Sequence, residues 1–104
     1  VRAGVARLDA LGYGCAALLV DSIFSSDGVY ADPAGFLKPA VEWLQAQGAL
    51  LIADEVQPGF GRTGAGMWGF ARHQVTPDVV TMGKPMGDGH PLAVPLARAG
   101  NGWS

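Results

Sequence analysis

The sequence has little of what defines several large classes of protein. Cysteine occurs once in 104 residues, which excludes a disulfide framework and a metal site built from several cysteines. Seven Lys and Arg stand against nine Asp and Glu, so the chain lacks the basic excess typical of nucleic-acid-binding proteins. Its hydrophobic runs are much shorter than the roughly 20 residues that a membrane-spanning helix needs. We therefore expect neither a nucleic acid nor a membrane as a partner.

The residues that are present are typical of a folded chain. Hydrophobic residues make up 49% of the sequence and charged residues 15%, which is too apolar and too weakly charged for a disordered protein. The chain is shorter than an average domain and opens inside a helical pattern, in which Val1, Val5 and Leu8 share one face. We expect a fragment that is incomplete at both ends. The sequence shows no signal or transit peptide, and we expect a cytoplasmic location.

Three short hydrophobic runs predict the strands of a sheet. They are Cys15–Val20, Leu50–Ala53 and Val79–Met82, and a fourth strand is expected over Leu92–Ala97. The first three runs are continuous rather than alternating, which favours parallel strands covered on both faces. We therefore predict an α/β fold with a mostly parallel sheet and crossover helices.

A helix is predicted between the first two strands. Asp32 is a candidate N-cap with Pro33 in the first turn, although Pro39 also allows a start near Gly35. Gly48 fits the position just after the helix. One apolar stripe runs along this segment and contains Phe36, Leu37, Ala40, Val41 and Leu44. Strand, helix and strand then form a βαβ unit.

The second crossover, from Gln57 to Pro77, begins with a glycine-rich loop. A short helix is expected over Met67–His73, and residues 100–104 (GNGWS) carry no predicted element. Cys15 is expected to be a small buried residue at the start of the first strand. His73 and His90 lack metal-ligand spacing to each other or to Cys15, so we predict no metal site.

Three ionisable residues follow the predicted parallel strands. Asp21 follows the first strand, Asp54 the second and Lys84 the third. Ligands of parallel α/β sheets bind outside the carboxyl ends of the strands, which lie on one edge. A partly desolvated lysine there can form a Schiff base with pyridoxal phosphate, and a carboxylate can keep the pyridine nitrogen of that cofactor protonated. Lys84 and Asp54 suit these roles, but the spacing alone favours a surface salt bridge beside a turn.

Three ordered motifs resemble a known family. They are DEVQ at residues 54–57, GFGRTG at residues 59–64 and PDVVTMGK at residues 77–84. Together they closely resemble the class III pyridoxal-phosphate aminotransferases, which are fold-type-I enzymes and typically homodimers. The resemblance extends from about residue 16 to residue 93. It implies that residues 1–104 are part of the large, cofactor-binding domain.

The resemblance implies a role for each matched residue. Lys84 matches the Schiff-base lysine, which also shuttles a proton, and Asp54 matches the carboxylate on the pyridine nitrogen. Val56 matches the residue against the ring face, and Gln57 the side chain near the phenolic oxygen. Arg62 matches the arginine of the glycine-rich loop, where we expect a structural role. The implied cofactor is pyridoxal 5'-phosphate, and the implied substrates are an amine or amino acid and a keto acid.

The sequence also departs from the family pattern. Residues 21–24 read DSIF where the family commonly has Glu-Pro, so Asp21 is a candidate substrate-facing residue on a shorter stem. Residues 83–91 (GKPMGDGHP) are most similar to the ethanolamine-phosphate phospho-lyases, which eliminate phosphate. A phospho-lyase and a non-catalytic α/β module therefore remain alternatives. The family's phosphate-binding loop and substrate-carboxylate arginine correspond to positions outside these 104 residues.

Overall fold

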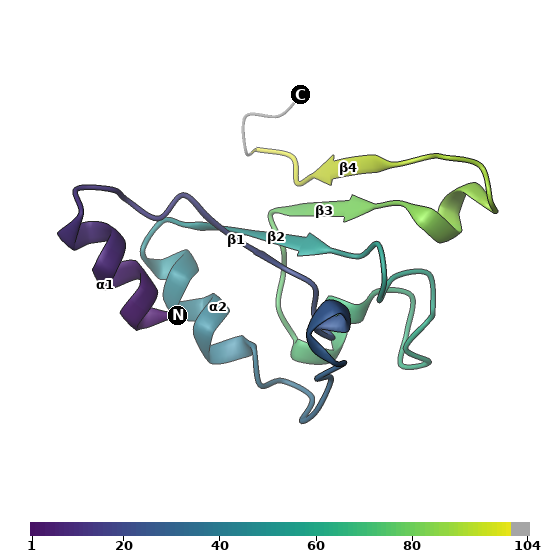
Figure 1. Ribbon diagram of the computed structural model, residues 1–104, viewed down its shortest axis with the longest axis horizontal. Helices are drawn as coiled ribbons and strands as arrows, with labels where there is room; N and C mark the ends of the chain where they lie inside the picture. Colours follow the sequence, from purple (N-terminus) through teal and green to yellow (C-terminus); the bar gives the residue numbers. More distant parts are fainter. Residues whose placement is uncertain (101–104) are drawn as a thin grey trace.

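The computed structural model describes residues 1–100 and forms one four-stranded sheet with helices in its crossovers (Figure 1). The strands lie in the order β1-β2-β3-β4, with β1, β2 and β3 parallel and β4 antiparallel to β3. The strands are β1 (Ala17–Val20), β2 (Leu50–Asp54), β3 (Val79–Met82) and β4 (Val94–Ala97). The helices are α1 (Arg2–Ala10), α2 (Lys38–Ala46) and the short 3-10 helices η1 (Ser25–Asp27), η2 (Gly69–His73) and η3 (Lys84–Gly87).

The predicted βαβ unit is confirmed, and its strands pair in register from Ala17 opposite Leu50 to Val20 opposite Ala53. The strand over Val79–Met82 is also confirmed. The first strand begins at Ala17, so Cys15 precedes it and is only half-buried. The prediction for residues 101–104 lies outside the described residues.

The start of α2 differs from the prediction. The helix begins at Lys38 with Leu37 at the N-cap position, so the prediction of Asp32 as the cap is wrong. Asp32 instead accepts a hydrogen bond from Arg72, with 2.8 Å between Oδ1 and the guanidinium nitrogen. Pro39 lies in the first turn of the helix, where its missing N–H has no helical acceptor to lose. Gly48 has φ +87° directly after the last turn, as predicted.

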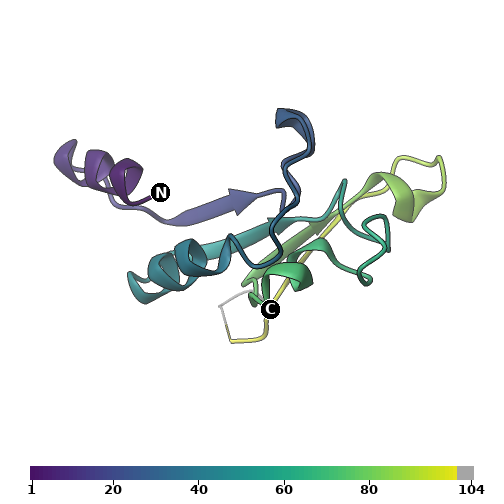
Figure 2. The ribbon, with the colours of Figure 1, turned by 90° about the horizontal axis from the view of Figure 1, so that it is seen from below.

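The core lies between α2 and the sheet. Leu37 and Val41 pack against Leu51, and the partly buried residues around them are Leu18, Val20, Phe24 and Val75. Residues of η2 close the same face, which Figure 2 shows beneath the strands together with α2. Burial of the Val41 and Leu51 side chains contributes about 1.5–3 kcal/mol each.

Asp78 connects β2, β3 and β4 at the end of the sheet where the parallel strands begin. Its carboxylate accepts hydrogen bonds from the backbone N–H of Leu51 (2.8 Å) and from Arg98 (2.6 Å). The first bond joins the start of β3 to β2, and the second joins it to the end of β4. This carboxylate therefore helps to set the strands in register at the edge opposite their carboxyl ends.

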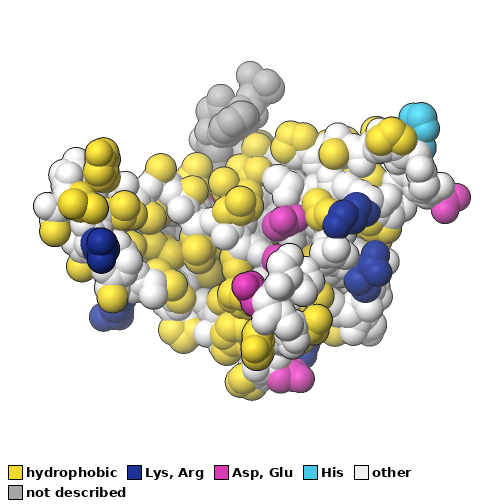
Figure 3. Space-filling view, in the orientation of Figure 1, with side chains coloured by type: hydrophobic (Ala, Val, Ile, Leu, Met, Phe, Trp, Pro, Cys, Tyr) yellow, Lys and Arg dark blue, Asp and Glu magenta, His cyan; other side chains and the backbone are white. Residues whose placement is uncertain are grey.

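The other face of the sheet is open within residues 1–100. Leu19 on this face is 63% exposed, so the prediction that the strands are covered on both faces is not met by these residues. Hydrophobic side chains gather over this face (Figure 3). The outer edge of β1 also has no strand partner among the described residues.

We expect the isolated 104-residue chain to fold poorly and to aggregate, because an open apolar face and a free strand edge favour association. Size-exclusion chromatography and thermal unfolding of the purified chain test this. A monomer with one sharp, cooperative unfolding transition would contradict it.

Candidate functional site

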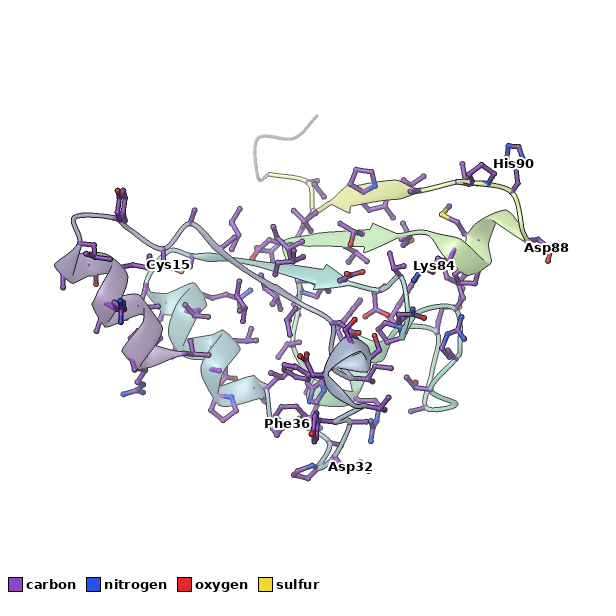
Figure 4. All side chains as sticks on the ribbon, viewed as in Figure 1. Cys15, Asp32, Phe36, Lys84, Asp88 and His90 are labelled. Carbon is purple, nitrogen blue, oxygen red and sulfur yellow. The ribbon has the colours of Figure 1, made fainter. Side chains whose placement is uncertain are left out.

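The carboxyl ends of the three parallel strands meet at one edge of the sheet, as predicted. Asp54 is the last residue of β2, and Asp21 directly follows β1. Lys84 begins η3, two residues after the end of β3, and lies at this edge in Figure 4. The parallel register sets Asp54 opposite Thr81 of β3. Residues separated by more than 60 positions in the sequence therefore share one region of the surface.

Two neighbouring hollows divide this edge. Asp21 and Asp54 line the first, together with Phe24 and Asp27. Val56 and Lys84 line the second, a groove of about 460 Å³ that is completed by Gly83 and residues 90–93. Gln57, which follows Val56, is half-buried and lines neither of these two hollows. Asp54 lines the first hollow and Val56, two residues further along the chain, lines the second.

The carboxylate of Asp54 is held on one side and free on the other. Its Oδ1 atom accepts the backbone N–H of Val56 at 3.0 Å and is 3.4 Å from the hydroxyl of Thr81. Within residues 1–100, no hydrogen bond is formed by Oδ2 of Asp54. A fixed carboxylate with one free oxygen is suited to accept a hydrogen bond from a protonated ring nitrogen.

Lys84 is exposed, and it forms no ion pair with another residue of the described chain. This removes the surface salt bridge as an explanation of its position. These residues do not supply the desolvated setting that we predicted for its amine. The backbone at Lys84 has φ +39°, in the left-handed region that non-glycine residues rarely adopt. Such strained backbone occurs more often at functional sites than elsewhere.

The carboxylate of Asp21 is used within its own turn. It accepts the backbone N–H groups of Ile23 (3.0 Å) and Ser25 (2.9 Å), and the hydroxyl of Ser25 also donates to it. These bonds fix the chain between β1 and η1. The geometry therefore gives Asp21 a structural task at this edge, and its contact with a substrate stays a prediction.

Two buried residues have contacts that the sequence did not predict: Glu55 was given no role, and His73 was considered only as a metal ligand. Glu55 has no exposed surface, and its carboxylate accepts the backbone N–H groups of Gly69 (2.8 Å) and Phe70 (2.9 Å). His73 is also fully buried, and its Nδ1 atom accepts the N–H of Gly35 at 3.1 Å. The proton of this imidazole therefore lies on Nε2, 3.0 Å from the carbonyl oxygen of Ser22. A glutamate directly after a buried strand was the available signal for Glu55.

Burial raises the pKa of Glu55 above its ordinary value of 4.5. The two backbone hydrogen bonds lower this pKa, whereas the nearby charges of Asp21 and Asp54 raise it further. Because the folded pKa lies above the unfolded one, the folded state binds the proton more tightly. The stabilisation from this proton is complete below pH 4.5 and is lost as the pH rises through the folded pKa.

We therefore expect the free energy of unfolding of the full-length wild type to fall, relative to that of Glu55→Gln, as the pH rises from about 4 to 7. Chemical denaturation at several pH values measures this difference. Glu42, on the exposed side of α2, is the only other glutamate of the sequence. Glu42→Gln should follow the wild type, and a pH-independent difference between wild type and Glu55→Gln would contradict the prediction.

No three His, Cys, Asp or Glu side chains in residues 1–100 are grouped so that they could hold a metal ion. No helix in this part of the chain is long and apolar enough to cross a membrane.

Comparison with known proteins gives consistent matches. The family model "Aminotransferase class-III" matches residues 5–100. Alanine–glyoxylate aminotransferase 2, a human mitochondrial protein, is 50% identical over 78 residues, which are 75% of this chain and 15% of the human protein. The chain thus spans less than a fifth of the length of that relative.

Solved structures agree with the sequence matches. A phospholyase from Arthrobacter, solved with phosphoethanolamine, superimposes with a TM-score of 0.87 at 46% identity, over 94% of this chain and 23% of that one. N-acetylornithine aminotransferase from Stenotrophomonas maltophilia superimposes with a TM-score of 0.76 at 35% identity, over 93% of this chain and 26% of that one. The α/β fold with a mostly parallel sheet is that of part of the fold-type-I enzymes. The chain belongs to the class III aminotransferase family.

Proposed function

We propose that this chain is a segment of the large domain of a pyridoxal 5'-phosphate-dependent enzyme. The full-length protein transfers an amino group between an amine or amino acid and a keto acid. One observation carries the proposal: Asp54, with a free carboxylate oxygen, lines one hollow of the sheet edge, and Val56 and Lys84 line the other. Class III aminotransferases use this cofactor, and pyridoxal phosphate is named at the active site of the matched ornithine aminotransferase from Toxoplasma gondii.

The described residues fit this cofactor. Oδ2 of Asp54 would accept a hydrogen bond from the protonated ring nitrogen, while Val56 N–H holds Oδ1 in place. The Val56 side chain would pack against the ring, Gln57 would bind on the side of the phenolic oxygen, and the Lys84 amine would supply the nucleophile for the aldehyde group. When bound, the cofactor acts as an electron sink for the bonds at the substrate Cα. The Lys84 amine would also hold and move the proton that leaves this carbon.

The site is incomplete without residues outside this chain. Lys84 is exposed and the groove beside it is open, whereas an amine nucleophile needs partial desolvation to lose its proton. The exposed apolar face of the sheet also needs a cover. We propose that the remaining domain and a second copy of the protein supply these surfaces, so that the full-length enzyme is a homodimer. We also propose a cytoplasmic location, although the matched human protein is mitochondrial by name.

The test uses the full-length protein loaded with cofactor. We expect a visible absorbance band from the lysine-bound cofactor, and we expect amino transfer from a panel of amines and amino acids to pyruvate. Analytical ultracentrifugation gives the oligomeric state. A protein that neither binds the cofactor nor transfers an amino group would contradict the proposal.

A phospho-lyase is the second candidate function, and two observations favour it. The Arthrobacter phospholyase superimposes with a TM-score of 0.87, compared with 0.76 for the N-acetylornithine aminotransferase. The carboxylate of Asp21 is engaged by its own turn, which leaves it less able to pair with a substrate-binding arginine. In this reaction the carbon–oxygen bond of a phosphorylated amino alcohol breaks and inorganic phosphate leaves.

We expect the two candidate functions to separate with one substrate. A transaminase releases no phosphate from phosphoethanolamine, whereas a phospho-lyase releases one phosphate for each molecule consumed. A colorimetric phosphate assay with the holoenzyme measures this, with pyruvate-dependent amino transfer recorded in parallel. Release of phosphate without amino transfer would replace the first candidate function by the second.

A further inference from the structure

Glu55 joins three parts of the chain at one buried point. Its backbone N–H donates to the carbonyl oxygen of Thr81 at 2.9 Å, which continues the pairing of β2 with β3. Its two carboxylate oxygens accept the N–H groups of Gly69 and Phe70 at the start of η2. Since the side chain has no exposed surface, water does not compete for these bonds.

The glycine-rich loop begins and ends on this residue. The N–H of Gly59 donates to the carbonyl oxygen of Glu55 at 3.0 Å, so Glu55 binds both ends of the loop from Gly59 to Gly69. Both ends are tightly packed. A Cβ atom at Gly59 would lie 2.5 Å from that carbonyl oxygen, and one at Gly69 would lie 2.5 Å from Cβ of Pro58. Glycine is therefore required at both ends for the loop to close over the carboxylate.

Glu55 lies between Asp54, which lines the first hollow, and Val56, which lines the second. Asp54 precedes it and Val56 follows it, and these two are joined by the bond from Val56 N–H to Oδ1 of Asp54. A rotation of the chain at Glu55 would move both side chains together. Burial of the Glu55 charge also opposes stability at neutral pH, because its pKa is raised. A fully hydrogen-bonded residue that lowers the free energy of unfolding is more readily explained by a role in the functional site than by a role in the fold.

We propose that Glu55 is a positioning residue of the cofactor site. By holding both ends of the loop from Gly59 to Gly69, its carboxylate fixes the orientation of Asp54 and Val56 toward the cofactor ring. This inference rests on the proposed function. Glu55 itself does not touch the cofactor.

The test uses the coupling between closure of the loop from Gly59 to Gly69 and binding of the cofactor. If closure of the loop favours cofactor binding, then cofactor binding must favour closure of the loop by the same factor. In the full-length wild type we expect pyridoxal 5'-phosphate to slow hydrogen exchange at the Gly69 and Phe70 amides by about tenfold. In Glu55→Gln, one of these N–H groups faces an amide donor, and the dissociation constant of the cofactor should rise about tenfold. Glu42→Gln is the matched control and should bind as the wild type does.

The outcomes separate this inference from the proposed function. A wild type that does not bind the cofactor overturns both. A wild type that binds, with the same dissociation constant in Glu55→Gln and unchanged exchange at Gly69 and Phe70, overturns only the role of Glu55. If Glu55→Gln does not fold, the exchange measurement on the wild type decides alone: slower exchange with cofactor supports the role, and unchanged exchange overturns it.

Discussion

Replacing Lys84 with alanine in the full-length protein should abolish the covalent link to the cofactor. The visible absorbance should change from that of the lysine-bound cofactor to that of the free aldehyde, because no other lysine follows a strand of this sheet edge. Turnover should fall by at least about 1000-fold, as expected when the nucleophile of a covalent enzyme is removed. Absorbance spectra and steady-state kinetics measure both effects.

The sequence offers a matched control for this variant. Lys38 is the only other lysine, and it lies on α2 with its Nζ atom 3.9 Å from the carboxylate of Glu42. Lys38→Ala should keep both the spectrum and the turnover of the wild type. A normal spectrum in Lys84→Ala would show that the cofactor is attached to another residue and would contradict the role of Lys84.

Replacing Asp54 with asparagine should have the second largest effect. The amide removes the negative charge that keeps the ring nitrogen protonated, so the cofactor loses much of its capacity to accept electrons. Loss of one partner of such a charge pair costs about 2–5 kcal/mol, and we expect turnover to fall on the order of 100-fold. The N–H of Val56 still finds an acceptor if the amide oxygen takes the place of Oδ1, so the fold should persist.

Two further measurements distinguish loss of charge from general damage at Asp54. Asp9→Asn changes an exposed carboxylate of α1 and should leave turnover unchanged. A cofactor analogue with a methylated ring nitrogen carries a permanent positive charge and should restore part of the activity of Asp54→Asn. Full activity of Asp54→Asn with the natural cofactor would contradict the role of Asp54.

The parallel direction of the first three strands, and the edge where Asp21, Asp54 and Lys84 lie, followed from local sequence patterns. The apolar runs before Asp21, Asp54 and Lys84 are long enough to specify strands, and the crossover geometry of parallel strands then brings the three residues to one edge. The second crossover contains a 3-10 helix that begins at Gly69, and Met67 and Trp68 precede it. The glycines around it leave the backbone free, so contacts with Glu55 rather than local preference decide where it starts.

The remaining details of the site depend on contacts between distant residues. The hydrogen bond from Arg72 engages the side chain of Asp32, the predicted helix cap, and it joins residues 40 positions apart. The buried imidazole of His73 binds Gly35 and Ser22 in the same long-range manner. The positive φ of Lys84 could not be predicted from its residue type, because lysine rarely adopts the left-handed region. Such features are set by packing after the elements are in place, which a pattern of neighbouring residues does not encode.

The central claim is that Lys84 is the residue that binds the cofactor covalently. Borohydride reduction of the full-length protein with bound cofactor converts the linkage into a stable secondary amine, and peptide mass spectrometry then locates it. We predict a single phosphopyridoxyl group on Lys84. A group on Lys38 or on a lysine outside these residues, with Lys84 unmodified, would contradict the account.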